Sequence, residues 1–150
     1  MVQDFSGLEE NFNATVPDKF KSRITFQAHD FFTPQPVKNA DVYFLRHILH
    51  DWADTKAVDI LQNIVSALKD GARIVVADRV LPPLGSVPMT QERMMRAADI
   101  AMMTMLNSKE RTREDWIALF EKADKRLKVK DFVQPPGMLD TFIEVVFNAT

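Results

Sequence analysis

The chain contains no cysteine, and only four of its 150 residues are glycine. The missing cysteine excludes disulfide bonds and metal sites built on thiolates. No apolar run approaches the ~20 residues that cross a membrane, and the N-terminus shows no basic and then apolar signal peptide, so we expect a cytoplasmic protein. Neither sign of charge dominates. A net charge of −2 and an isoelectric point of about 5.9 give no reason to expect nucleic acid or an anionic membrane as a partner.

Histidine is scarce as well, with three residues in the whole chain: His29, His47 and His50. No two of them have the spacing of a zinc-binding pair on a helix, so the sequence predicts no metal site. The hydrophobic share of 46% is enough to form a core. The length fits one domain or one large part of a bigger domain.

One stretch, Asp41 to Asp54 (DVYFLRHILHDWAD), joins a strand signal to candidate chemistry. Val42 to Leu45 is a short apolar run, typical of a strand buried on both faces. His50 and Asp51 follow it, and a helical pattern begins shortly afterwards. In open α/β sheets, ligands bind beyond the carboxyl ends of the strands. An imidazole at that place can exchange a proton near neutral pH.

The remaining chain alternates strand and helix signals. Apolar, β-favouring runs predict strands that end at Asp4 and that span residues 23–30, 41–49, 73–78, 127–133 and 141–147. Helical spacing predicts helices from residue 54 or 55 up to Gly71, over 91–106, and from 112, where a capping box opens the helix. Pro135-Pro136-Gly137 predicts an antiparallel hairpin between the last two strands. This order predicts an α/β fold with a mostly parallel sheet and an antiparallel C-terminal end.

Ionisable residues stand at the ends of four apolar runs: Asp4, Asp30, His50 with Asp51, and Asp78. Asp is common where strands turn, and this preference can explain any single one of these endings. If the strands are parallel, however, all four groups gather along one edge of the sheet, where they can form a site.

Several segments then match a known family: VQD, AHDFF, LRHILHDW, VVADRVLP, NSKERTREDW and FIEVVF. The chain resembles the C-terminal catalytic region of the S-adenosylmethionine-dependent O-methyltransferases that act on plant phenolics and fungal polyketides. LRHILHDW and KERT are specific in combination. The resemblance implies a Rossmann-like, doubly wound sheet ending in an antiparallel hairpin. It also implies S-adenosylmethionine as cofactor and a small hydroxylated aromatic or polyketide-type molecule as acceptor.

The resemblance implies catalytic and acceptor-binding roles. His50 falls on the family's general base, and Asp78 and Glu110 fall on the two acidic positions that flank it. A neutral His50 would remove the proton of the acceptor hydroxyl, and an acid on its other ring nitrogen would fix the tautomer. Met102 and Met103 fall on a helix that lines the acceptor pocket in the family, although methionines at helical spacing also serve as core filler.

Cofactor roles are implied in the same way. Asp4 falls where a carboxylate of the family holds the two ribose hydroxyls, a geometry that one carboxylate can accept. Asp30 and Phe31 fall in the segment that lines the adenine. Arg46 stands near the cofactor at a position that usually holds lysine, so a donor is retained.

The front of the family's domain has no counterpart in this chain. A glycine-rich turn of the type DxGxGxG is expected there, whereas no two of the four glycines lie near each other. In the strand order 3-2-1-4-5 the missing first strand is the central one. We therefore expect residues 1–150 to be a partial catalytic domain. It lacks the glycine-rich motif and the N-terminal domain through which the family forms homodimers, and alone it should be inactive.

Three functions stay open. The first is an O-methyltransferase, either part of a longer chain or completed by a partner. The second is a non-catalytic, truncated methyltransferase-like module. The third is a nicotinamide-dependent dehydrogenase, which would also use an acid such as Asp4 for the ribose. That third function leaves the HDW and KERT segments without a role, and we rank it last.

Overall fold

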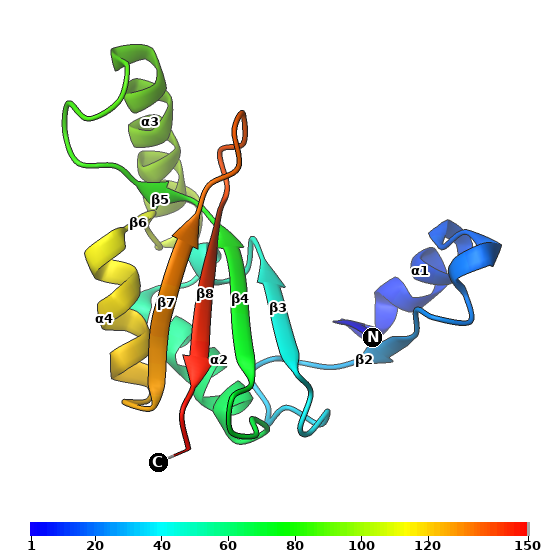
Figure 1. Cartoon of the computed structure of the whole chain (residues 1–150). Coiled ribbons are helices and arrows are strands. Elements are labelled where there is room, and N and C mark those ends of the chain that lie inside the picture. Colours follow the sequence, from blue (N-terminus) through cyan, green and yellow to red (C-terminus); the bar gives the residue numbers. More distant parts are fainter. Residues whose placement is uncertain (150) are drawn as a thin grey trace.

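The computed structural model describes residues 1–149, and its main sheet has the strand order β3-β4-β8-β7 (Figure 1). β3 (Val42–Arg46) and β4 (Arg73–Asp78) run parallel. β8 (Thr141–Phe147) is antiparallel both to β4 and to β7 (Leu127–Val133). The sheet is therefore mixed, and the predicted α/β class and C-terminal hairpin are confirmed.

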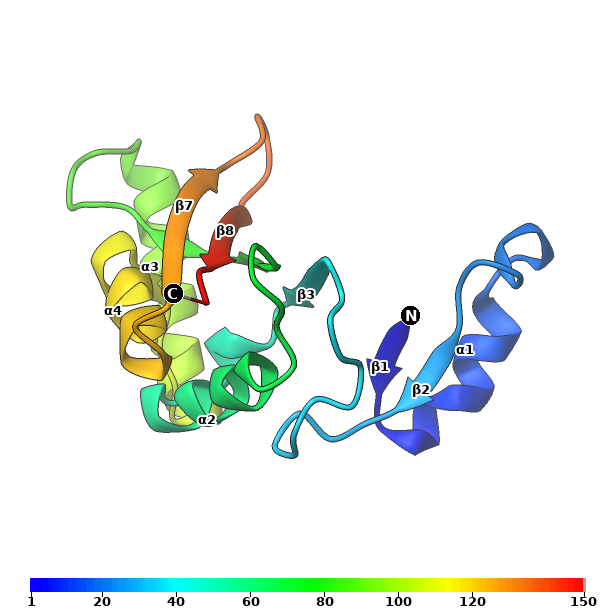
Figure 2. The same ribbon diagram turned by 60° about the horizontal axis from the view of Figure 1, so that its bottom comes forward.

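A smaller unit stands at the N-terminal end. β1 (Val2–Asp4) and β2 (Phe26–Ala28) form a parallel pair, joined by α1 (Glu9–Thr15) and two short 3-10 turns, Ser6–Leu8 and Asp18–Phe20. Figures 1 and 2 show this unit beyond β3, separated from the main sheet. Among the described residues no strand pairs with the second edge of β1 or of β3. This is the interruption that a missing central strand predicts.

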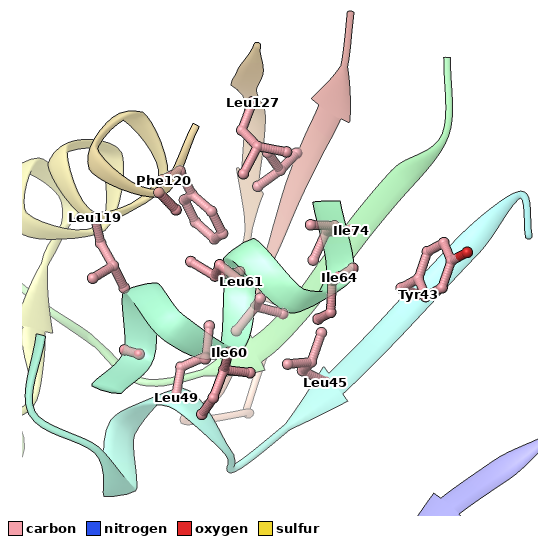
Figure 3. Packing of buried hydrophobic residues seen from close by; sticks show 14 of the residues in the cluster. Tyr43, Leu45, Leu49, Ile60, Leu61, Ile64, Ile74, Leu119, Phe120 and Leu127 are labelled. Atoms are coloured by element: carbon pink, nitrogen blue, oxygen red, sulfur yellow. The ribbon is translucent and has the colours of Figure 1, made fainter. Parts of the chain in front are cut away.

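Two helices cover one face of the main sheet and build the core with it. α2 (Asp54–Val65) contributes Ile60, Leu61 and Ile64, which pack between the sheet and α4 (Arg113–Ala123) (Figure 3). Each of these buried aliphatic side chains stabilises the fold by about 1.5–3 kcal/mol. The helical spacing in the sequence predicted α2, but the helix ends at Val65, before the predicted stop at residue 71, and turns connect it to β4.

The prediction that β3 is buried on both faces is wrong. Tyr43 and Leu45 point into the core, but Val42 and Phe44 are 51% and 57% exposed. Side chains alternate across a strand, so both exposed residues lie on the face opposite α2 and α4. No element in the described part of the chain covers that face, and an apolar run by itself does not reveal whether both faces have partners.

α3 (Met89–Leu106) projects from the end of the main sheet where β4 and β7 finish (Figure 1). Of its side chains only Met95 is buried, while Met94 and Met105 are 52% and 75% exposed. The helix ends at Asn107, whose left-handed φ of 52° reverses the chain toward the sheet. The methionines of α3 are therefore mostly surface residues and not core filler.

The chain after α3 enters a second short parallel pair. β6 (Arg111–Thr112) pairs with β5 (Val80–Leu81), and α4 begins immediately afterwards. The Thr112 side chain accepts a hydrogen bond from the Asp115 amide, and the Asp115 carboxylate accepts one from the Thr112 amide. The predicted capping box is present, and it fixes the start of α4 next to the end of β4.

Candidate active site

His50 lies just beyond the carboxyl end of β3, in the 3-10 turn η3 (Leu49–Asp51). His47 adopts a left-handed φ of 51°, which turns the chain sharply out of the strand. Histidine is among the residues that adopt this conformation more often than most. The turn carries the His50 ring inward, where only 8% of the residue is exposed.

Carboxylates surround the His50 ring. Its Nδ1 lies 3.4 Å from Oε1 of Glu110, a long hydrogen bond, and 3.7 Å from Oδ1 of Asp78. Its Nε2 lies 3.3 Å from Oδ1 of Asp51. Asp78 and Glu110 are buried, with exposed fractions of 0% and 2%. The structure thus brings together His50, Asp78 and Glu110, which lie far apart in the sequence.

Strand pairing and loop contacts explain this convergence. Asp78 is the last residue of β4, and the parallel pairing of β3 with β4 places it beside the exit of β3. Glu110 arrives from the loop after α3, where its amide donates to the Asp99 carboxylate at 2.8 Å. In the same loop the Ser108 hydroxyl donates to the backbone carbonyl of His50. The loop and the turn are therefore bonded to each other.

Burial and mutual charge shift the protonation of this group. Burial raises the pKa of Asp78 to about 7; the Glu110 charge adds to this rise and the His50 charge opposes it. Burial alone would lower the pKa of His50, but the hydrogen bond to Glu110 and the charges of Asp78, Glu110 and Asp51 outweigh it. The net pKa of His50 is raised. Asp78 consequently gains or loses its proton close to neutral pH, as general acids and bases do.

A pH dependence of stability follows from these shifts. The folded chain binds more protons at Asp78 than the unfolded chain between about pH 4 and pH 7, so the free energy of unfolding falls as the pH rises through that window. The raised pKa of His50 acts in the same direction; its contribution is complete below pH 6.5 and is lost as the pH rises through the folded pKa. Asp78→Asn should flatten the fall between pH 4 and 7 by up to about 1.4 kcal/mol per pH unit.

Urea unfolding of both chains at a series of pH values measures this slope. Asp59→Asn, which changes an exposed carboxylate paired with Lys56 on α2, is the matched control and should keep the slope of the unmodified chain. An Asp78→Asn variant with the unmodified slope would show that the buried carboxyl does not titrate in this range.

Arg111 is a residue of this region that the sequence did not single out, although it belongs to the KERT segment. Its side chain is fully buried. It donates to the Leu49 carbonyl at 2.8 Å, to the Trp52 carbonyl at 2.8 Å and to the Asp54 carboxylate at 2.9 Å. The guanidinium therefore holds the backbone on both sides of His50. Its five donors suit such a task, but nothing in a linear sequence shows that a charged residue is buried.

His47 forms a second contact between distant parts of the chain. Its Nε2 lies 3.0 Å from Oδ2 of Asp140, which precedes β8. Arg46, a predicted cofactor contact, has a side chain that is 62% exposed and lies 3.7 Å from the same carboxylate. The hydrogen bond of His47 therefore links the end of β3 to the segment before β8.

The predicted ribose and adenine contacts lie on the N-terminal unit. Asp4 is exposed at the end of β1, and Asp30 follows β2 at the same edge of the parallel pair. The Asp30 carboxylate accepts a hydrogen bond from the Phe32 amide. Phe31 and Phe32 pack edge-on against Trp52, with ring centroids 6.0 and 4.7 Å away. Trp52 therefore connects the segment after β2 to the turn that carries His50.

Met102 and Met103 lie on the C-terminal half of α3. Met102 is half-buried, and Met103 is 59% exposed. The structure shows two open grooves along this helix, and neither is lined by these two residues. One of them runs between α3 and the β7–β8 connection and is lined by Gln91, Met94 and residues 134–139.

A model of the O-methyltransferase domain matches residues 4–125. The chain belongs to the O-methyltransferase domain family. Curated relatives agree. O-methyltransferase VdtC of Byssochlamys spectabilis is 48% identical over 131 residues, which are 87% of this chain and 30% of the relative. O-methyltransferase aoiO of Aspergillus oryzae is 44% identical over 147 residues, 97% of this chain and 37% of that protein. The chain thus spans about a third of the length of these relatives.

Solved structures of similar proteins contain SAM (S-adenosylmethionine) or SAH (S-adenosylhomocysteine). LepI in complex with SAM is 36% identical, with a TM-score of 0.84 over 97% of this chain and 35% of its own. OxaC in complex with SAH and oxaline is 27% identical, with a TM-score of 0.80 over 98% of this chain and 35% of its own. Within residues 1–149, no helix of this family member is long and apolar enough to cross a membrane.

Proposed function

We propose that this chain supplies the base-bearing part of an enzyme that transfers a methyl group from S-adenosylmethionine to a hydroxyl of a small aromatic or polyketide-type acceptor. The buried His50, with Glu110 and Asp78 beside its Nδ1, is the observation that carries the proposal. Membership in the O-methyltransferase domain family and similarity to proteins solved with SAM or SAH support it.

The residues of the N-terminal unit fit such a cofactor. The exposed Asp4 carboxylate at a strand end can accept both hydroxyls of a ribose. Phe31, in contact with Trp52, offers an aromatic face to an adenine, with Asp30 beside it. Arg46 is an exposed donor at the end of β3. When bound, S-adenosylmethionine supplies an electrophilic methyl group on a sulfonium, so the protein has mainly to align it and exclude water.

His50 has the role of the general base. In its neutral form with the proton on Nδ1, the ring donates to Glu110 and keeps a lone pair on Nε2, which lies 3.3 Å from Oδ1 of Asp51 and can take the proton of the acceptor hydroxyl. The imidazolium that forms is stabilised by the Glu110 and Asp78 carboxylates. General base catalysis of this kind is typically worth about 10²- to 10⁴-fold in rate. Since the pKa of His50 is raised, activity should increase as the pH rises through that value.

A second reaction class has its own observation. One similar solved structure is that of a pericyclic reaction enzyme, with 35% identity and a TM-score of 0.83. The fold alone therefore does not distinguish methyl transfer from another reaction. The buried base favours methyl transfer, because a proton must leave the acceptor hydroxyl. A non-catalytic module remains the alternative if neither reaction occurs.

A chimera tests the proposal. The segment of aoiO that aligns with this chain is replaced by residues 1–150, so that the rest of the relative's chain can complete the site. With S-adenosylmethionine and a panel of hydroxylated aromatic compounds, we expect formation of S-adenosylhomocysteine together with a methylated product by mass spectrometry. A folded chimera that binds the cofactor but methylates no compound that aoiO itself methylates would contradict the proposal.

A further inference from the structure

His47, His50 and Asp78 form a cluster that the catalytic role of His50 does not fully explain. Each of the three can offer one ligand atom, and these atoms all lie within 4.8 Å of one another. Nδ1 of His47 is 3.8 Å and Nδ1 of His50 is 3.7 Å from the same oxygen, Oδ1 of Asp78. Two imidazole nitrogens thus face one buried carboxylate oxygen.

Asp78 points to a missing ligand at this place. The residue is fully buried, and neither oxygen of its carboxylate has a hydrogen-bond partner within the described part of the chain. A buried carboxylate without a partner is costly. The nitrogen–oxygen distances are too long for hydrogen bonds. A tetrahedral zinc ion with bonds of about 2.0–2.1 Å holds its ligand atoms roughly 3.3 Å apart, within about 0.5 Å of these two distances.

The opposite nitrogens of both rings also suit a metal ligand. Nε2 of His47 lies 3.0 Å from Oδ2 of Asp140, and Nε2 of His50 lies 3.3 Å from Oδ1 of Asp51. An ionised carboxylate only accepts, so the contact of His47 favours the proton on Nε2 and leaves the lone pair of its Nδ1 directed at Asp78. Nδ1 of His50 donates to Glu110 in the metal-free chain, so a bound metal ion displaces that proton, and Nε2 beside Asp51 can carry it instead. Histidines that bind metal ions usually donate their second nitrogen to a carboxylate in this way.

We propose that His47, His50 and Asp78 bind a divalent transition-metal ion of the zinc type, with a fourth position left for water. Two imidazoles and one carboxylate select zinc over magnesium or calcium, which prefer sets of oxygen ligands. The side chain of His47 is 35% exposed, so the ion has a route from solvent. The expectation of no metal site rested on spacing along a helix. Here the left-handed turn at His47 and the pairing of β3 with β4 assemble the ligands instead.

Zinc bound at this site should affect methyl transfer, an expectation that rests on the proposed function. A metal ion on Nδ1 of His50 replaces the hydrogen bond to Glu110 and leaves the proton on Nε2. That nitrogen can then no longer take the acceptor proton, so zinc should inhibit methyl transfer. Binding itself does not depend on this function and is tested without cofactor or acceptor.

The test is a calorimetric titration of the metal-free 150-residue chain with zinc, with magnesium as the comparison ion. We expect one zinc ion per chain and no detectable magnesium binding. His47→Asn should weaken zinc binding at least about 10-fold. Loss of a residue that only hydrogen-bonds a metal ligand already lowers metal affinity about 10- to 100-fold, and His47 is itself a ligand in this proposal. Asn tolerates the left-handed backbone at position 47. The matched control is His29→Asn, which removes the one histidine outside the cluster and should leave the affinity unchanged.

An NMR titration of the unmodified chain keeps the proposal testable if a variant fails to fold, which circular dichroism would reveal. Zinc should shift the imidazole signals of His47 and His50 and leave those of His29 in place. No zinc binding, equal affinity in His47→Asn, or shifts confined to His29 would each overturn the proposal.

Discussion

Replacing His50 by Gln in the aoiO chimera is expected to lower kcat by about 10²-fold or more, with little change in the Kd for S-adenosylmethionine. Gln is similar in size and can hydrogen-bond to Glu110, but it cannot accept a proton. The Ser108 hydroxyl bonds to the backbone carbonyl at position 50 and not to the ring, so the turn should keep its shape. Steady-state formation of S-adenosylhomocysteine gives kcat, and calorimetry gives the Kd.

His29→Gln is the control for this variant. The link of His29 to Asp4 is made by the backbone amide, which the substitution leaves in place, so both kcat and the Kd should be retained.

Asp4→Ala should show the converse of His50→Gln, with weaker cofactor binding as its main effect. A His50→Gln chimera that keeps most of its turnover would remove His50 from the role of base, whatever its effect on binding.

The 150-residue chain by itself is expected to bind S-adenosylmethionine weakly or not at all and to transfer no methyl group. Asp4 stands on the small β1–β2 unit and His50 on the main sheet, and no strand pairing joins the two units within residues 1–149. A misplacement of 1 Å can already cost about 10²-fold in rate. Gly71, Gly85 and Gly137 adopt positive φ in separate turns, so none of them forms a cofactor loop with another.

Calorimetric titration of the chain with S-adenosylmethionine, beside the same titration of the aoiO chimera, measures this difference. The chimera serves as the positive control because it adds the rest of the relative's chain, of which the matched segment is 37%. Micromolar affinity of the 150-residue chain would show that the two units are aligned without a strand between them, and would make the chain an enzyme candidate by itself.

Local chemistry explains why parts of the fold could be predicted from residues alone. The capping box at Thr112 and the hairpin turn at Pro135-Pro136-Gly137 depend on neighbours within a few positions, and both are present. α2 was predicted from the spacing of its apolar residues, although the predicted helix ran past its actual end at Val65. Helix ends depend on whether the final residues find partners, which local spacing does not show.

The candidate site was predictable to a similar degree. Parallel strands end at the same edge, so a strand that ends at Asp78 and a strand that leads to His50 were expected to meet, and they do. Glu110 was predicted as a site residue only through the family resemblance. It lies in a loop whose path depends on contacts of Asp99 and Ser108, which the sequence does not show.

The sequence by itself determined the order of the longer strands and helices, the C-terminal hairpin and the residues that stand at strand ends, because each of these follows from short-range patterns; the two-residue strands β5 and β6 were not predicted. Only the tertiary structure decided that one face of β3 stays uncovered, that Arg111 is buried under the His50 turn, and that His47 faces the unpartnered Asp78 carboxylate. These three facts depend on which distant segments pack together. The free energy of burying a charge or an apolar face is set by those distant partners, and adjacent residues do not reveal them.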